Sequence, residues 1–212
     1  MKKIVILAIV ITAAVSVSAQ SSKESKESKS KFGLKAGYNF SNVIGSGSSF
    51  DPKHNNGYMV SAFFCGSNKN GLGYRSELVY SKQGYSFDDG GKNTDVMNDY
   101  LYMPHLMTYT IGRVVQLQAG AQIGVLLNAK KTSGNKDSSI TDLMNRFDYG
   151  FAGGVEVYPF KGLIVGTRYN LGLGKMYKQH EQTPTTPYPL PFDPSTTNLK
   201  NGILQLFIGY RF

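Results

Sequence analysis

The last segment of the chain, residues 201–212, constrains the fold more than any other. Its residues alternate between two faces and end on an aromatic side chain. One face carries Leu204, Leu206, Ile208, Tyr210 and Phe212, and the other carries Gln205, Gly209 and Arg211 together with Ile203 and Phe207. A transmembrane β-barrel needs such a strand to close, because an open sheet edge in lipid leaves backbone N–H and C=O groups unpaired. The segment therefore predicts that the rest of the chain repeats this alternation.

The beginning of the chain has the composition of a secretory signal peptide. Lys2 and Lys3 precede the apolar run Ile4–Val15, and Val17-Ser18-Ala19 fits a cleavage site before Gln20. The apolar run is shorter than the roughly 20 residues that a spanning helix needs. The next stretch, SSKESKESKSK, contains no apolar residue, which favours disorder. We therefore expect a signal peptide over 1–19, a disordered periplasmic tail over 20–31 and one barrel domain over 32–212.

Eight segments after this tail alternate with a period of two, which is typical of β-strands and not of helices. The clearest runs from Val115 to Asn128, and the weakest, Tyr100–Ile111, contains Pro104. The predicted strands cover residues 32–40, 58–65, 72–81, 100–111, 115–128, 147–157, 163–173 and 201–212. An even number of antiparallel strands places both ends of the barrel domain on the same side of a sheet or barrel.

The connections between these segments alternate between long and short. The short ones are Gly66–Asn70, Gly112–Arg113 and Pro159–Gly162, and the long ones are Ser41–Asn56, Gly84–Asp99, Ala129–Asn145 and Gly174–Lys200. Outer-membrane barrels have short periplasmic turns and longer external loops. The pattern therefore predicts that both ends of the barrel domain lie on the periplasmic side.

A soluble barrel or sandwich is the main alternative to a membrane barrel. It would bury the apolar faces and expose the polar faces to water. Here Tyr and Phe gather near the strand ends, while glycines and charged residues share the opposite faces. That combination favours lipid outside and a narrow polar interior. We therefore predict an all-β fold, an eight-stranded antiparallel up-and-down transmembrane β-barrel, in the bacterial outer membrane.

Charged residues on the polar faces form the candidate site. They are Arg75, Glu77, Glu156, Arg168 and Arg211, all on the inward phase of their strands. A charge facing lipid would cost about 2–4 kcal/mol at mid-membrane, whereas inward charges can pair through charge-assisted hydrogen bonds. We interpret them as an ion network that holds the barrel shut, with a proton or ion path as the alternative. Because side chains about fill an eight-stranded barrel, a general porin is disfavoured.

The sequence resembles the PorT-like outer-membrane β-barrel family. The resemblance is carried in order by FGLKAGYNFSN (Phe32–Asn42), GLGYRSELVYSKQGYSF (Gly71–Phe87), YLYMPHLMTY (Tyr100–Tyr109), LQAGAQIGVLLNAK (Leu117–Lys130), GFAGGVEV (Gly150–Val157), GTRYNLGL (Gly166–Leu173) and LQLFIGYRF (Leu204–Phe212). It implies a barrel inserted by the β-barrel assembly machinery, with Tyr210 and Phe212 as the terminal assembly signal. The chain departs from the family where Tyr102 and Met103 stand in a stretch that often holds an acidic residue.

Catalysis would require a histidine near Ser or Asp at the outer rim. His54 follows Asp51, His180 precedes Glu181, and His105 lies beside Pro104. No cluster has the spacing of a known catalytic motif. We therefore expect no catalytic residue, no cofactor and no metal site. The single cysteine, Cys65, cannot form an internal disulfide and is expected to be a buried small side chain.

The favoured function is a non-enzymatic barrel with a structural or binding role through its external loops. One alternative is a component of a protein export or assembly complex, and another is a rim-site hydrolase. The expected partners are outer-membrane lipid, the β-barrel assembly machinery, and a periplasmic or extracellular protein. The proline-rich stretch at 183–194 is expected to be a stiff exposed connection. The formal net charge of +9 raises nucleic acid as a partner, but export and the lack of a basic helix argue against it.

Overall fold

Period-two alternation produces extended strands along nearly the whole described chain. The computed structural model describes residues 31–46, 52–66, 71–88, 91–134, 136–178 and 198–212. The ring is built from β1 (Lys31–Ser46), β2 (Lys53–Cys65), β3 (Gly71–Asp88), β4 (Asn93–Ile111), β5 (Val115–Ser133), β7 (Phe147–Val157), β8 (Leu163–Gly172) and β9 (Asn198–Arg211). Two smaller elements, β6 (Lys136–Ser139) and the 3₁₀ helix η1 (Thr141–Leu143), lie between β5 and β7.

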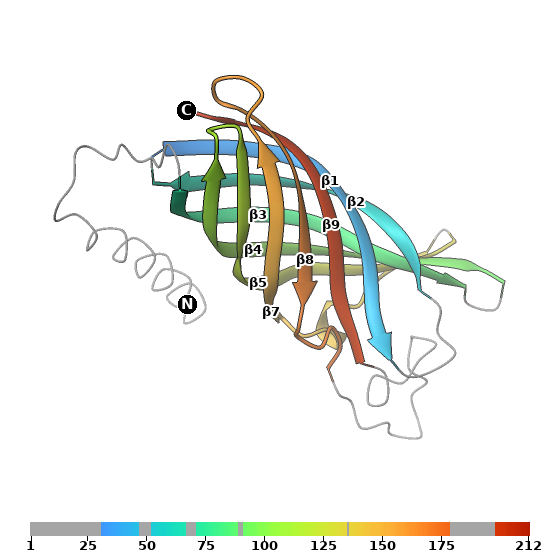
Figure 1. Ribbon diagram of the computed structural model, residues 1–212. Helices are drawn as coiled ribbons and strands as arrows, with labels where there is room; N and C mark the ends of the chain where they lie inside the picture. The colour runs from blue at the N-terminus through green and yellow to red at the C-terminus, as the bar shows by residue number, and fades with distance from the viewer. Residues whose placement is uncertain (1–30, 47–51, 67–70, 89–90, 135, 179–197) are drawn as a thin grey trace, which may run out of the picture.

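The eight long strands close into a ring in which every pairing is antiparallel. The order is β4-β3-β2-β1-β9-β8-β7-β5, and β4 also pairs with β5. The terminal strand β9 pairs with β8 on one side and with β1 on the other, so the first and last strands close the barrel (Figure 1). The predicted eight-stranded antiparallel barrel is confirmed. The short strand β6 extends a hairpin from β5 beyond the ring.

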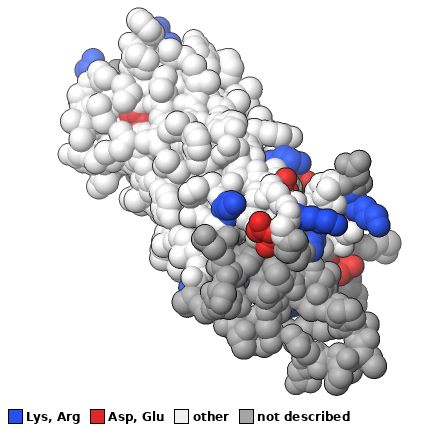
Figure 2. Space-filling view, turned by 90° about the vertical axis from the view of Figure 1, so that its right-hand side faces the viewer, with Lys and Arg blue, Asp and Glu red and all other residues white. Residues whose placement is uncertain are grey.

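Apolar side chains cover the outside of the barrel, and polar side chains share its interior with further apolar ones. In β9, the side chain of Ile208 is 57% exposed, whereas that of Gln205 is 2% exposed. A water-soluble barrel would show the reverse arrangement, because exposed apolar patches of this size mark a membrane or partner surface. On the face in Figure 2, Lys and Arg side chains lie toward the two ends, and a broad surface without them separates the ends. The lipid-facing interpretation of the alternation is therefore confirmed.

Several strands are longer than the sequence predicted. The expected loops Gly84–Asp99 and Ala129–Asn145 are wrong in large part, because β3 and β4 pair out to Asp88 and Asn93 and β5 continues to Ser133. Inward aromatic and apolar side chains continue the alternation there. In β5 the alternation is interrupted by a bulge at Leu127, since Tyr100 pairs with Leu126 and Asp99 pairs with Asn128. The first long loop is also shorter than expected, because β1 reaches Ser46 and β2 begins at Lys53.

The weak alternation around Pro104 has a local cause. The ladder between β3 and β4 pairs Ser76 with His105 and Val79 with Tyr102, and it is interrupted between those pairs. Pro104 lies in this gap and has no N–H to donate. On its other side, Pro104 pairs with Gln122 of β5, so the strand continues through the proline.

The two ends of the barrel differ in how the strands are joined. At the turn end, which holds Lys31, Phe212 and the short connections, Gly112 and Arg113, with φ of 59° and 65°, are the central residues of a turn in which the Val114 N–H donates to the Ile111 carbonyl. The opposite, loop end holds β6, η1 and the longer connections. The sequence-based proposals for 1–30, Asp51, His180, Glu181 and 183–194 lie outside the described residues. Among the residues described, no helix is long and apolar enough to cross a membrane.

Candidate functional site

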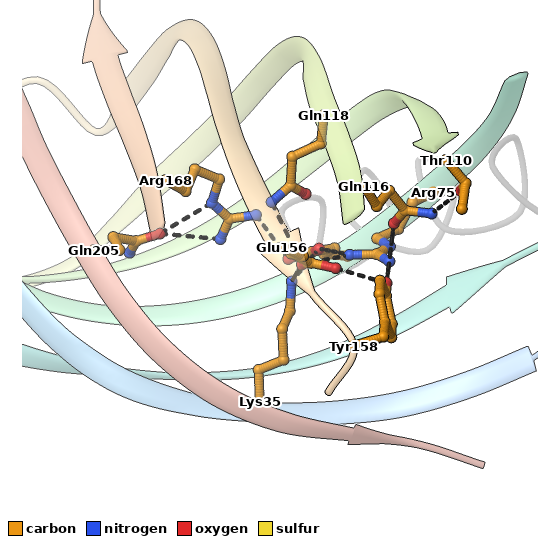
Figure 3. A network of polar contacts seen from close by, with 10 residues as sticks. Lys35, Arg75, Thr110, Gln116, Gln118, Glu156, Tyr158, Arg168 and Gln205 are labelled. Atoms are coloured by element: carbon orange, nitrogen blue, oxygen red, sulfur yellow. Dashed lines mark hydrogen bonds and ion pairs between the residues drawn. The ribbon is translucent and has the colours of Figure 1, made fainter. Parts of the chain in front are cut away.

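Two buried carboxylates hold the centre of the lumen together. Glu77 of β3 accepts from Lys35 Nζ at 2.5 Å and from Arg168 Nη1 at 2.8 Å. Glu156 of β7 accepts from Arg75 Nη1 at 2.6 Å and from the same Lys35 Nζ at 3.1 Å. Lys35 therefore joins the two carboxylates, and the ion pairs connect four strands across the barrel (Figure 3).

Neutral polar groups surround these charges and add further hydrogen bonds to them. Arg75 Nη2 donates to Gln116 Oε1 at 2.6 Å and to the Tyr158 hydroxyl at 2.8 Å. Tyr158 in turn donates to Glu156 Oε2 at 2.8 Å. On the other side of the lumen, Arg168 donates from Nε and Nη2 to Gln205 Oε1 at 3.1 and 3.0 Å. Each carboxylate and guanidinium is thus held by several partners.

Two inward phenylalanine rings complete the packing of the cations. Arg75 Cζ lies 4.5 Å from the centre of the Phe63 ring, and Lys35 Nζ lies 4.7 Å from the centre of the Phe207 ring. Such contacts attract cations, more strongly when both groups are desolvated. Gly33 makes room for one ring, because a Cβ built there would lie 2.2 Å from Phe63 Cζ. Small inward residues therefore give the large ones space within the lumen.

The site has one more positive charge than negative charges. Three cations, Lys35, Arg75 and Arg168, face two carboxylates, Glu77 and Glu156, and the exposed fraction of every one of these side chains is at most 1%. Burial of charges is costly, and it is tolerated here because each charge has opposite charges and hydrogen bonds around it. The arrangement fills the cross-section of the lumen with side chains.

A chain of neutral hydrogen bonds continues from this network toward the loop end. Gln205 Nε2 donates to Asn39 Oδ1 at 3.0 Å, and Asn39 Nδ2 donates to Ser81 Oγ at 2.9 Å. Ser81 then donates to Gln83 Oε1 at 3.3 Å, and Gln83 Nε2 donates to the Tyr102 hydroxyl at 3.2 Å. The chain ends where Tyr102 and Asn201 both donate to Asp148, at 2.8 and 2.9 Å. Polar side chains therefore continue to fill the lumen beyond the charges.

An apolar cap closes the lumen at the loop end. Inward side chains of β3 and β4 pack there against residues from the β5–β7 connection, from the segment that follows β8 and from the start of β9. The buried members of this cap include Tyr85, Phe87, Val96, Ile140, Met144, Met176, Tyr177 and Leu199. Met144 and Tyr177 form an antiparallel bridge, and the hydroxyls of Tyr85 and Tyr177 lie 2.5 Å apart. These connections therefore fold over the barrel mouth.

The structure brings together four of the five charged residues that the sequence singled out. Arg75, Glu77, Glu156 and Arg168 share the network. Arg211 lies nearer the turn end, where its Cζ sits 4.4 Å from the Tyr158 ring, and it makes no salt bridge to another described residue. Sequence reasoning missed Lys35, although Lys35 lies on the inward phase of β1. The same alternation rule would have included it.

The residues considered for catalysis and assembly lie outside this network. His54 is exposed near the start of β2, and His105 lies on the outward side of β4, where it hydrogen-bonds the Tyr74 hydroxyl. Within the described ranges, no group of three His, Cys, Asp or Glu residues could hold a metal ion. Tyr210 pairs with Leu34 and Leu163, and the Phe212 ring stacks on Phe32 at 6.2 Å. Both terminal aromatics therefore face outward at the turn end.

Comparison with solved structures finds small outer-membrane barrels. Neisserial surface protein A (NspA) is 16% identical over 87% of this chain and 99% of its own, with a TM-score of 0.52. Ail of Yersinia pestis is 19% identical over 87% and 99%, with a TM-score of 0.48, and OprG of Pseudomonas aeruginosa is 11% identical over 88% and 97%, with a TM-score of 0.47. At these identities the likeness concerns the fold alone. No curated protein matches the chain.

Comparison with protein families gives a match over most of the chain. Residues 18–178 match the family described as "Outer membrane protein beta-barrel domain". This match agrees with the closed ring, the apolar exterior and the polar lumen, and it places the protein in the bacterial outer membrane. The chain belongs to the outer membrane protein beta-barrel domain family.

Proposed function

We propose that this protein is a closed, non-enzymatic barrel that acts through its surfaces and not through its lumen. The single observation that supports this proposal is the filled cross-section, in which the Lys35, Arg75, Glu77, Glu156 and Arg168 side chains are at most 1% exposed. A solute that passed through the lumen would have to break several charge-assisted hydrogen bonds, each of which is stronger than a neutral hydrogen bond. The barrel then has a structural role and presents its loop end to partners.

In this proposal, the ion network maintains the shape of the barrel. Arg168 and Glu77 connect opposite walls, and Lys35 connects both carboxylates.

Tyr210 and Phe212 act as the signal for the assembly machinery. Their outward position at the end of the terminal strand supports this role. Replacing Phe212 by Ser should lower insertion into the outer membrane. Replacing the exposed loop-end residue Lys175 by Ser, as a control, should leave insertion unchanged.

Co-purification distinguishes this function from a role in a PorT-like export or assembly complex. The full-length protein is extracted from its own outer membrane with mild detergent and purified through a tag in the loop between β3 and β4. Recovery of the barrel without a stoichiometric periplasmic partner is expected. A stoichiometric complex that engages the turn end would favour the export role instead.

The same preparation tests the rim-site hydrolase. We expect no hydrolysis of phospholipid or peptide substrates above the rate of a heat-denatured sample. Hydrolysis that disappears when His54 and His180 are both replaced by Ala would contradict the non-enzymatic proposal.

A further inference from the structure

A basic pocket lies at the turn end, next to the mouth of the lumen. Four cationic side chains line it: Lys31 at the start of β1, Arg113 in the β4–β5 turn, Lys161 in the β7–β8 turn, and Arg211 of β9. Its volume is about 450 Å³, and no Asp or Glu is among its lining residues.

Arg211 is held in this pocket without being neutralised. Its guanidinium lies over the Tyr158 ring, with Cζ 4.4 Å from the ring centre, and its Nε has no hydrogen-bond partner among the described residues. Tyr158 is itself fixed by Arg75 and Glu156 of the ion network. Through Tyr158, the network therefore positions the Arg211 guanidinium at the pocket.

An apolar groove on the outer wall adjoins this pocket. It has a volume of about 690 Å³ and runs over β1, β2, β3, β4 and β9. Ala36 and Ala62 hollow it, because larger residues such as Leu34, Val60 and Ile208 stand around them. Tyr210 lines both the groove and the basic pocket. Because the groove lies on the surface that faces the hydrocarbon of the membrane, the group that meets it there is a lipid acyl chain.

We propose that the pocket and groove together bind one anionic phospholipid. The phosphate is held by the four cationic side chains, and one acyl chain lies in the groove past Tyr210. Phe160 and Phe212, which are 74% and 66% exposed beside the pocket, are placed as aromatic anchors at the level of the headgroups. Short turns mark the periplasmic end of an outer-membrane barrel, so this lipid belongs to the inner leaflet. The site goes beyond the proposed function, because it does not depend on what the loop end binds.

Native mass spectrometry of the purified full-length barrel tests the proposal. The protein is mixed with phosphatidylglycerol or with phosphatidylcholine carrying the same acyl chains, and the retained lipids are counted. Wild type is expected to retain phosphatidylglycerol preferentially. In the variant Arg113→Gln/Lys161→Gln, affinity for phosphatidylglycerol should fall about 30-fold, the factor expected for two surface cations near anionic lipid. A matched control, Lys92→Gln/Lys136→Gln, removes two exposed charges at the loop end and should bind as wild type does.

A second arm separates lipid binding from simple phosphate binding. Ala62→Leu fills the groove and should weaken retention of phosphatidylglycerol, while binding of the soluble headgroup glycerol phosphate stays unchanged. Ala121→Leu, on the outward side of β5, is the control and should retain the lipid. If the Arg113→Gln/Lys161→Gln variant does not fold, as judged by loss of the compact, heat-modifiable band on a gel, Lys161→Gln alone is tested. It should still lower the affinity for phosphatidylglycerol about fivefold. Equal retention of the two lipids by wild type, or equal loss in test and control variants, would overturn the proposal.

Discussion

Arg168 Nη1 lies 2.8 Å from Glu77 Oε2, although 91 positions separate the two residues in the chain. Arg168 belongs to β8 and Glu77 to β3, and these strands are four steps apart in either direction around the ring. The ion pair therefore crosses the full width of the lumen. It can form only after the barrel has closed, so it reports on the closed state.

Neutralising the two members of this pair should have unequal effects. Arg168→Gln leaves two cations against two carboxylates, whereas Glu77→Gln leaves three cations against Glu156 alone. Removing one partner of a buried pair costs about 3–5 kcal/mol, and we expect Glu77→Gln to lie at the upper end of that range. Urea unfolding of the barrel in lipid vesicles measures the loss of unfolding free energy in both variants.

The double variant Glu77→Gln/Arg168→Gln provides the interaction energy. It should be destabilised by less than the sum of the single variants, with a coupling of about 0.5–3 kcal/mol, because the two residues are in contact. Lys175→Gln, an exposed residue at the loop end, is the control and should unfold as wild type does. Additive effects of the two substitutions would show that the pair does not stabilise the closed barrel.

Gly33→Ala should destabilise the barrel through the packing of the lumen. The added Cβ would lie 2.2 Å from Phe63 Cζ and 2.6 Å from the Tyr210 carbonyl oxygen, so the ring and the backbone would both have to move. Overpacking of this kind costs about 1–3 kcal/mol. The control is Gly66→Ala, where the new Cβ meets nothing within 4 Å. Equal unfolding temperatures for the two variants would argue against a tightly filled interior.

Met144→Ala should loosen the apolar cap at the loop end. Met144 is fully buried and bridges Tyr177, so its truncation leaves a cavity that costs about 2–5 kcal/mol. Faster cleavage of the β5–β7 connection in limited proteolysis is the expected result. Asp142→Ala, an exposed neighbour in η1, should be cleaved at the wild-type rate. Equal cleavage of both variants would mean that the cap does not depend on this residue.

Cys65 should react slowly with a maleimide in the folded barrel and rapidly after denaturation. Its side chain points into the lumen at the turn end and is 6% exposed. The variant Cys65→Ala/Lys161→Cys carries the thiol on an exposed turn and should react rapidly without denaturant. Rapid labelling of native Cys65 would show that reagents enter the lumen from the turn end.

The alternation of side chains was sufficient to predict the eight-stranded ring and the inward face of each strand. The same alternation contains Lys35, which was missed only because a single lysine in a first strand carries no further signal. Which charges meet could not be predicted, since the pairing of Arg168 with Glu77 depends on how the ring closes and on strand stagger. The extent of β3 and β4 was also missed, because polar and glycine residues in 84–99 are typical of loops, although Tyr85, Phe87 and Val96 point inward.

Ion conductance across a planar lipid bilayer tests the closed lumen most directly. With the wild-type barrel inserted, we predict no single-channel steps above the baseline of the bare membrane, because charged, polar and apolar side chains fill successive levels of the interior. Insertion is verified by protease protection of the same sample. Stable, voltage-independent open steps from the inserted wild-type protein would contradict the account.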